Sequence, residues 1–99
     1  MSVFYLEPIL IDDVSAEADR ARAKFGDQYQ LNDFEWLAVV TEEVGEAANV
    51  LNEIVIDRTR KDPLDIGYAP EERRAQLRAE VVQIAATAAR WLAAMDEQR

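Results

Sequence analysis

The sequence predicts an all-α protein, a helical bundle of about three main helices per chain with a core completed by oligomerisation. Only three glycines and three prolines interrupt the 99 residues, so helix breakers are rare. Apolar residues recur at spacings of three and four in three long segments, which is typical of amphipathic helices. A chain of this length forms one domain, residues 1–99, and buries only about two-thirds of its unfolded surface. We therefore expect part of the core to lie between subunits.

The first helix is expected over residues 8–25. Pro8 suits a first helical turn, and Gly26 is placed to end the helix. Residues 1–7 precede it as an N-terminal arm, for which the sequence leaves open a short strand or a contact with a partner. The expected buried face consists of Leu10, Val14, Ala18, Ala21 and Phe25.

The second helix is expected from Asn32 to about Asp57. Asn32 is a favourable N-cap, and Glu35 follows at the spacing of a capping box. A continuous apolar stripe runs along this segment. Its members are Trp36, Leu37, Val40, Val44, Ala47, Leu51, Ile54 and Val55.

A third helix is expected to begin at Pro70, after an inter-helix loop over residues 58–69. Pro63 and Gly67 mark the loop. Glu71 and Glu72 fall in the first turn, where the helix dipole favours anions. The expected buried face consists of Leu77, Val81, Ile84, Ala85, Ala88, Trp91, Leu92 and Met95.

Charge and composition exclude several functional classes. Twenty acidic against eleven basic residues give a net charge of −9, which argues against binding to nucleic acid or to an anionic membrane surface. The chain has no cysteine and no histidine, so a bound metal would be held by oxygen, as Mg²⁺ or Mn²⁺ prefer. Residues 1–10 lack the basic flank and apolar run of a signal peptide. We expect a cytoplasmic protein.

The distribution of carboxylates on the second helix points to a metal. From Phe25 to Asp57 there are eight acidic residues and no lysine or arginine. Glu42 and Glu46 are four residues apart, and Glu43 and Glu46 are three apart, spacings at which like charges destabilise a helix. A divalent cation would reverse that effect because it needs several oxygens on one side. The alternative is a solvated acidic face.

Glu80 favours the metal interpretation. On a helical wheel it lies at the margin of the apolar face of the third helix, where a carboxylate usually pairs with a base or a metal. Gln83 and Thr87 continue a polar edge from Glu80. If the second and third helices pack antiparallel, the turn containing Glu42, Glu43 and Glu46 faces Glu80. Gly45 in that turn would permit close approach of a neighbouring helix, or would reflect neutral drift.

At these residues the sequence resembles the MazG-like proteins of the all-α nucleoside triphosphate pyrophosphohydrolase superfamily. The run 42–46 (EEVGE) corresponds to the EExxE motif of that family, and 80–83 (EVVQ) stands where the family has ExxD. The flanking sequence also resembles that family, at 24–28 (KFGDQ), 35–38 (EWLA), 83–86 (QIAA) and 91–92 (WL). The resemblance therefore spans roughly residues 15–95.

The resemblance implies a homodimer or homotetramer that uses Mg²⁺ to hydrolyse a nucleoside triphosphate, NTP or dNTP, to the monophosphate and pyrophosphate. It would serve in house-cleaning or in control of a nucleotide pool. By position, Glu43, Glu46 and Glu80 would be metal ligands, with Glu42 a further ligand or the residue that orients the attacking water. Gln83, in place of the final Asp of the motif, keeps an oxygen donor but loses a charge. The 33 residues between Glu46 and Glu80 exceed the usual separation.

Candidate substrate-binding residues are basic, amide or aromatic side chains near the acidic motifs. Each has a plainer alternative: a solvated loop for the basic cluster, and core packing for the aromatics. A different functional class is also open, a non-catalytic helical oligomerisation or nucleotide-binding module with a degenerate site, and net charge alone suggests a third, an acidic mimic of DNA. The candidates are Lys24, Arg20, Asn49, Arg58, Arg60, Lys61, Trp36, Phe25 and Trp91.

Overall fold

The computed structural model describes the backbone of residues 6–60 and 71–97 and the side chains of residues 6–54 and 71–97. Three helices make up almost all of it: α1 (Pro8–Phe25), α2 (Asp33–Arg60) and α3 (Glu71–Glu97). The described part contains no strand, so the prediction of an all-α chain with three main helices is confirmed. The second helix runs three residues into the expected loop. Most of that loop and of the N-terminal arm lies outside the described residues.

The helix ends form as the local sequence predicts. Gly26 ends α1 with a positive φ of 79°, and its N–H donates to the carbonyl of Arg22 at 2.8 Å. At the start of α2 the Asn32 side chain accepts from the N–H of Glu35 at 2.8 Å. The Glu35 carboxylate in turn accepts from the N–H of Asn32 at 3.1 Å. The predicted capping box is therefore confirmed.

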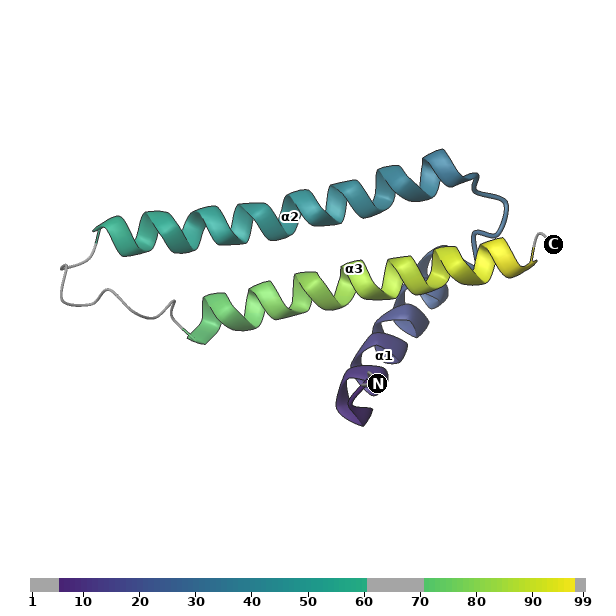
Figure 1. Cartoon of the computed structure of the whole chain (residues 1–99), viewed down its shortest axis with the longest axis horizontal. Coiled ribbons are helices and arrows are strands. Elements are labelled where there is room, and N and C mark those ends of the chain that lie inside the picture. The colour runs from purple at the N-terminus through teal and green to yellow at the C-terminus, as the bar shows by residue number, and fades with distance from the viewer. Residues whose placement is uncertain (1–5, 61–70, 98–99) are drawn as a thin grey trace, which may run out of the picture.

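Helix α3 is the central element. It packs against α2 over much of its length and also against α1. Figure 1 shows α2 and α3 side by side and antiparallel, with α1 crossing the C-terminal half of α3 at a steep angle. This arrangement brings the middle of α2 opposite the middle of α3, as the antiparallel hypothesis required.

The core is thin and consists mainly of alanine. Trp36 is the only large side chain that is fully buried within the described residues. The guanidinium of Arg90 lies over its ring, 5.3 Å from the centroid. The remaining buried apolar residues are Ala21, Ala47, Ile54, Ala86 and Ala94.

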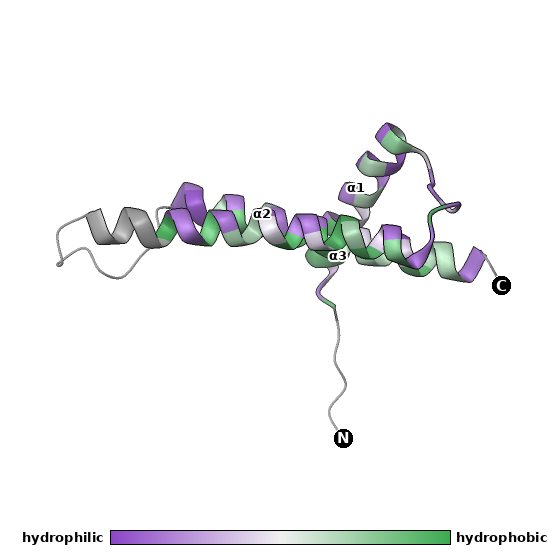
Figure 2. Ribbon diagram, turned by 90° about the horizontal axis from the view of Figure 1, so that it is seen from above, coloured by the Kyte–Doolittle hydropathy of each residue, from purple (hydrophilic) through white to green (hydrophobic). Residues whose placement is uncertain are grey.

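Much of the apolar surface predicted to be buried is exposed instead. Hydrophobic residues recur along the coloured parts of both long helices (Figure 2). Among the described residues, however, α2 packs against α3 alone, and α3 packs against α2 and α1. The radius of gyration is 16.7 Å, against about 13 Å for a compact domain of this length. A single copy of the chain thus leaves the expected faces half covered. The predicted core residues that prove exposed are Leu10, Phe25, Leu37, Val44, Leu51, Val81, Ala85, Ala88, Leu92 and Met95.

Candidate functional site

Carboxylates from all three helices lie near one another where α2 packs beside the middle of α3. Glu43 and Glu46 come from α2, Glu80 from α3 and Glu17 from α1. Glu80 interacts electrostatically with the other three, and Glu43 with Glu46 and Glu17. We call these four residues the acidic cluster. The structure therefore brings together the three glutamates that the sequence singled out as metal ligands.

The environment of the acidic cluster disfavours negative charge. Burial raises the pKa of Glu80, and a hydrogen bond with Glu46 raises it further, followed by the charges of Glu46, Glu43 and Glu17. Burial also raises the pKa of Glu43, while hydrogen bonding from the Thr87 hydroxyl acts in the opposite direction. The folded chain thus holds these two carboxyl groups above their ordinary range.

Two oxygens of the acidic cluster are left without a hydrogen bond. Glu43 Oε1 and Glu80 Oε2 are buried and have no partner. A buried carboxylate oxygen without a donor is unfavourable, and hard divalent cations are bound by such oxygens. As they stand, however, no three acidic side chains in residues 6–54 and 71–97 form a group that could hold a metal ion. The donor chemistry fits Mg²⁺, but the carboxylates would have to draw closer around it.

Glu17 is the member that sequence reasoning missed. Its carboxylate accepts from Arg20 Nε at 2.9 Å and from Arg20 Nη2 at 2.6 Å, and this hydrogen bonding lowers the pKa of Glu17. Arg20 also interacts electrostatically with Glu43, so it is a cation close to the acidic cluster. Nothing in the spacing of residues reveals this, because it depends on the angle at which α1 crosses α3.

Beside the acidic cluster, residues of α1 and α3 line a shallow groove of about 430 Å³. Gln83, the residue at the degenerate position of the second motif, lines this groove with Glu17 and Arg20. Arg78 lines it too, and pairs with Asp13 at 2.8 Å. The groove therefore places two guanidinium groups along one approach to the carboxylates.

Several other candidates lie apart from the acidic cluster. Glu42 and Asn49 are exposed, and Glu42 is not among the charges acting on Glu43 or Glu80. Lys24 is exposed, with its ammonium 5.1 Å from the centre of the Phe25 ring. The side chains of Arg58, Arg60 and Lys61 lie outside the described residues.

The aromatic candidates are core or surface residues. Trp36 is 1% exposed, which favours core packing over stacking on a base, the two interpretations that the sequence left open. Trp91 donates from Nε1 to Asp33 at 2.9 Å, joining α3 to the start of α2. At Gly45 a Cβ would meet nothing within 4 Å, so of the two interpretations of this glycine the described chain favours neutral drift over close approach of a helix.

The raised pKa values predict how stability depends on pH. The ordinary value for both carboxyl groups is 4.5, so the protonated form is favoured by folding. Their contribution to stability is fully present below pH 4.5 and is lost as the pH rises through the higher folded-state values. We expect the double variant Glu43→Gln/Glu80→Gln to melt above the wild type at pH 7.5 without divalent cations.

That advantage should shrink toward zero near pH 4, where the wild-type groups are protonated. Thermal melts followed by circular dichroism from pH 4 to pH 8 measure it. A difference in melting temperature that does not change with pH would contradict the assigned pKa directions.

Comparison with known proteins identifies no relative. No protein-family model matches the chain, and neither does any curated protein or solved structure. No helix among the described residues is both long and apolar enough to cross a membrane. The functional argument therefore depends on the residues of the acidic cluster themselves.

Proposed function

We propose that the protein is a Mg²⁺-dependent nucleoside triphosphate pyrophosphohydrolase of the MazG-like kind, with its active site at the acidic cluster. The observation that carries the proposal is the meeting of Glu43, Glu46 and Glu80, two of them with buried, unpartnered carboxylate oxygens. The resemblance of residues 42–46 and 80–83 to the two acidic motifs of that superfamily points to the same chemistry.

The roles of the residues follow from their charge and placement. Glu43, Glu46 and Glu80 would hold Mg²⁺, with Mn²⁺ as a substitute. Bound divalent ions neutralise phosphate charge and lower the pKa of coordinated water. Without them the carboxylates would repel a triphosphate. Arg20, held by Glu17 beside the groove, is the described cation best placed to meet a phosphate oxygen.

Our proposal departs from the sequence-based assignment in two details. Glu42 is exposed, so we do not assign it the role of orienting water in a single copy of the chain. Gln83 lines the groove and supplies only a neutral amide oxygen there. One carboxylate fewer in the second motif would weaken metal binding, and the proposal therefore places most of the metal affinity on Glu43, Glu46 and Glu80.

We also propose that the chain works as a homodimer or a homotetramer in the cytoplasm. The support is the row formed by Leu37, Val44 and Leu51 on α2, each about half exposed. These residues are spaced seven apart and share one side of the helix. In a two-fold dimer they would pack against the same row, or against another helix, of the second copy.

A panel of ribonucleoside and deoxyribonucleoside triphosphates tests the enzymatic proposal. The protein should release pyrophosphate, rather than inorganic phosphate, from at least one of them when Mg²⁺ is present in excess over the nucleotide. Release should stop with excess chelator and return when Mg²⁺ is restored. A protein that releases neither product from any nucleotide would contradict the proposal.

The alternative is a non-catalytic oligomerisation or nucleotide-binding module with a degenerate site, which the exposed apolar surface and Gln83 favour. The two differ in their response to Mg²⁺ alone. A metal present at a hundred times its dissociation constant stabilises the folded state by about 2.7 kcal/mol. If Mg²⁺ did not change the melting temperature and no nucleotide was hydrolysed, the enzymatic proposal would be rejected in favour of the non-catalytic module.

A further inference from the structure

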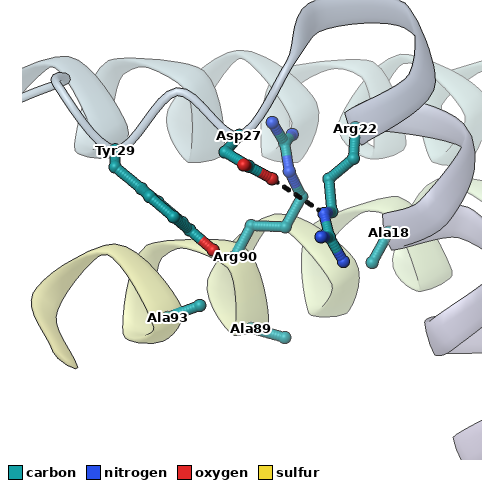
Figure 3. Close-up of a pocket in the computed structure, with 7 residues that line it drawn as sticks. All are labelled: Ala18, Arg22, Asp27, Tyr29, Ala89, Arg90 and Ala93. Carbon is teal, nitrogen blue, oxygen red and sulfur yellow. Dashed lines mark hydrogen bonds and ion pairs between the residues drawn. The ribbon is translucent and has the colours of Figure 1, made fainter. Parts of the chain in front are cut away.

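A second pocket lies where α1 and the 26–29 turn meet the C-terminal half of α3 (Figure 3). Its volume is about 140 Å³. None of the acidic cluster lines it. We call it the alanine pocket, after the three small residues on its walls. Its lining residues are Ala18, Arg22, Asp27, Tyr29, Ala89, Arg90 and Ala93.

The polar side of the alanine pocket is cationic, although the chain as a whole carries −9. Arg22 and Arg90 both lie beside Asp27 (Figure 3), and Arg22 Nε donates to Asp27 Oδ1 at 3.0 Å. Two guanidinium groups and one carboxylate line the pocket. Arg22 also lies 3.8 Å from Asp19, which is outside the lining, so Arg90 is the cation that a small anion would meet without a carboxylate partner.

Arg90 is the unusual member of this pair. It is only 7% exposed, and its hydrogen bonds go to neutral oxygens, Gln28 Oε1 at 2.5 Å and the Gly26 carbonyl at 3.3 Å. Its Nε is buried without a partner. No carboxylate of the described residues lies within ion-pair distance of it, and buried arginines usually have such a counter-charge.

Tyr29 and three alanines, Ala18, Ala89 and Ala93, make up the rest of the lining. Ala89 and Ala93 are exposed, so the pocket is open to solvent on that side. Its volume is close to that of an apolar cavity of about 150 Å³, which holds benzene. Space of this size beside a cationic end suits a ligand with a compact apolar body and one negative charge.

We propose that the alanine pocket binds a small organic monoanion, with its charged group at Arg22 and Arg90 and its apolar body against the three alanines. The class is a carboxylate the size of benzoate. None of the acidic cluster lines this pocket, although Arg90 interacts electrostatically with Glu43. Benzoate binding and pyrophosphate release are separate measurements, so either proposal can fail while the other holds.

Nuclear magnetic resonance titration of the full chain with benzoate tests the proposal. Saturable shifts are expected at the amides of residues 18, 22, 27–29 and 89–93. Two other probes separate the contributions. Benzamide keeps the ring but lacks the charge, and should bind about tenfold more weakly because a charge-assisted hydrogen bond is lost. Inorganic phosphate keeps the charge but lacks the ring, and should also bind more weakly than benzoate.

Two alanine variants form a matched pair. Ala93→Leu fills the alanine pocket without altering any charge, and should weaken benzoate binding by about tenfold or more. Ala85→Leu makes the same change at an exposed site of α3 outside the pocket, and should leave binding within about twofold. Circular dichroism checks that both variants keep their helix content.

Three results would overturn the proposal. They are the absence of saturable benzoate shifts at these amides, equal binding of benzoate and benzamide, and benzoate binding unchanged by Ala93→Leu in a folded protein. The first would show that no ligand of this class binds. The second would exclude a role for the two arginines, and the third would place the ligand elsewhere.

Discussion

Glu80→Gln is expected to abolish pyrophosphate release while raising the melting temperature at pH 7.5. The carboxylate of Glu80 is disfavoured by burial and by three neighbouring glutamates, so a neutral amide of the same shape removes a repulsive charge. The same change removes a proposed metal ligand. Loss of several kcal/mol of transition-state stabilisation corresponds to a decrease in rate of about a hundredfold or more.

The opposite directions of the two effects make Glu80→Gln informative. A residue that serves folding alone would lower stability and activity together. Here stability should rise in the absence of metal, and the stabilisation by Mg²⁺ that is expected for the wild type should be lost. Thermal melts with and without Mg²⁺ and a pyrophosphate assay give both readouts.

Glu72→Gln is the matched control, because it makes the same substitution at an exposed position in the first turn of α3. It should leave activity and the response to Mg²⁺ unchanged. If Glu80→Gln kept full activity, the acidic cluster would not be the active site. If it lowered the melting temperature at neutral pH, the electrostatic description of the acidic cluster would be wrong.

Val44→Glu is expected to convert the oligomer into monomers of 11.2 kDa. Val44 is 48% exposed in the isolated chain and lies in the row formed with Leu37 and Leu51. If that row packs against a second copy, the substitution buries an unpaired carboxylate on each side of the interface, which is strongly unfavourable. Sedimentation velocity should show the wild type at twice the monomer mass or more.

Asn49→Glu adds the same charge to an exposed position of α2 outside that row, and should leave the mass unchanged. A monomeric wild type would contradict the proposed oligomer. An oligomer that survives Val44→Glu would place the interface elsewhere, for example at the exposed apolar residues near the start of α1, Ile9 and Ile11.

Local sequence was sufficient for the helices and their ends. Pro8, Gly26 and the pair formed by Asn32 and Glu35 act through bonds within a few residues of themselves. Such interactions are encoded by spacing along the chain. The end of α2 was less well predicted, since residues 58–60 continue the helix and carry no strong breaker.

The candidate site was predictable only in part. Glu43, Glu46 and Glu80 could be found because two motifs on consecutive antiparallel helices must face each other. Glu17 and Arg90 could not be found in this way. Glu17 reaches the acidic cluster, and Arg90 reaches Gly26 and Gln28, only because α1 and the following turn fold back onto α3.

The sequence by itself determined the helices, their caps and the amphipathic stripes, since each depends on neighbours three or four residues away. Only the tertiary structure decided which parts of those stripes are covered. Leu37 and Trp36 are adjacent members of the same predicted stripe, yet Trp36 is enclosed and Leu37 is half exposed. Periodicity gives the direction of an apolar face, but the extent of its burial depends on where a second helix crosses it.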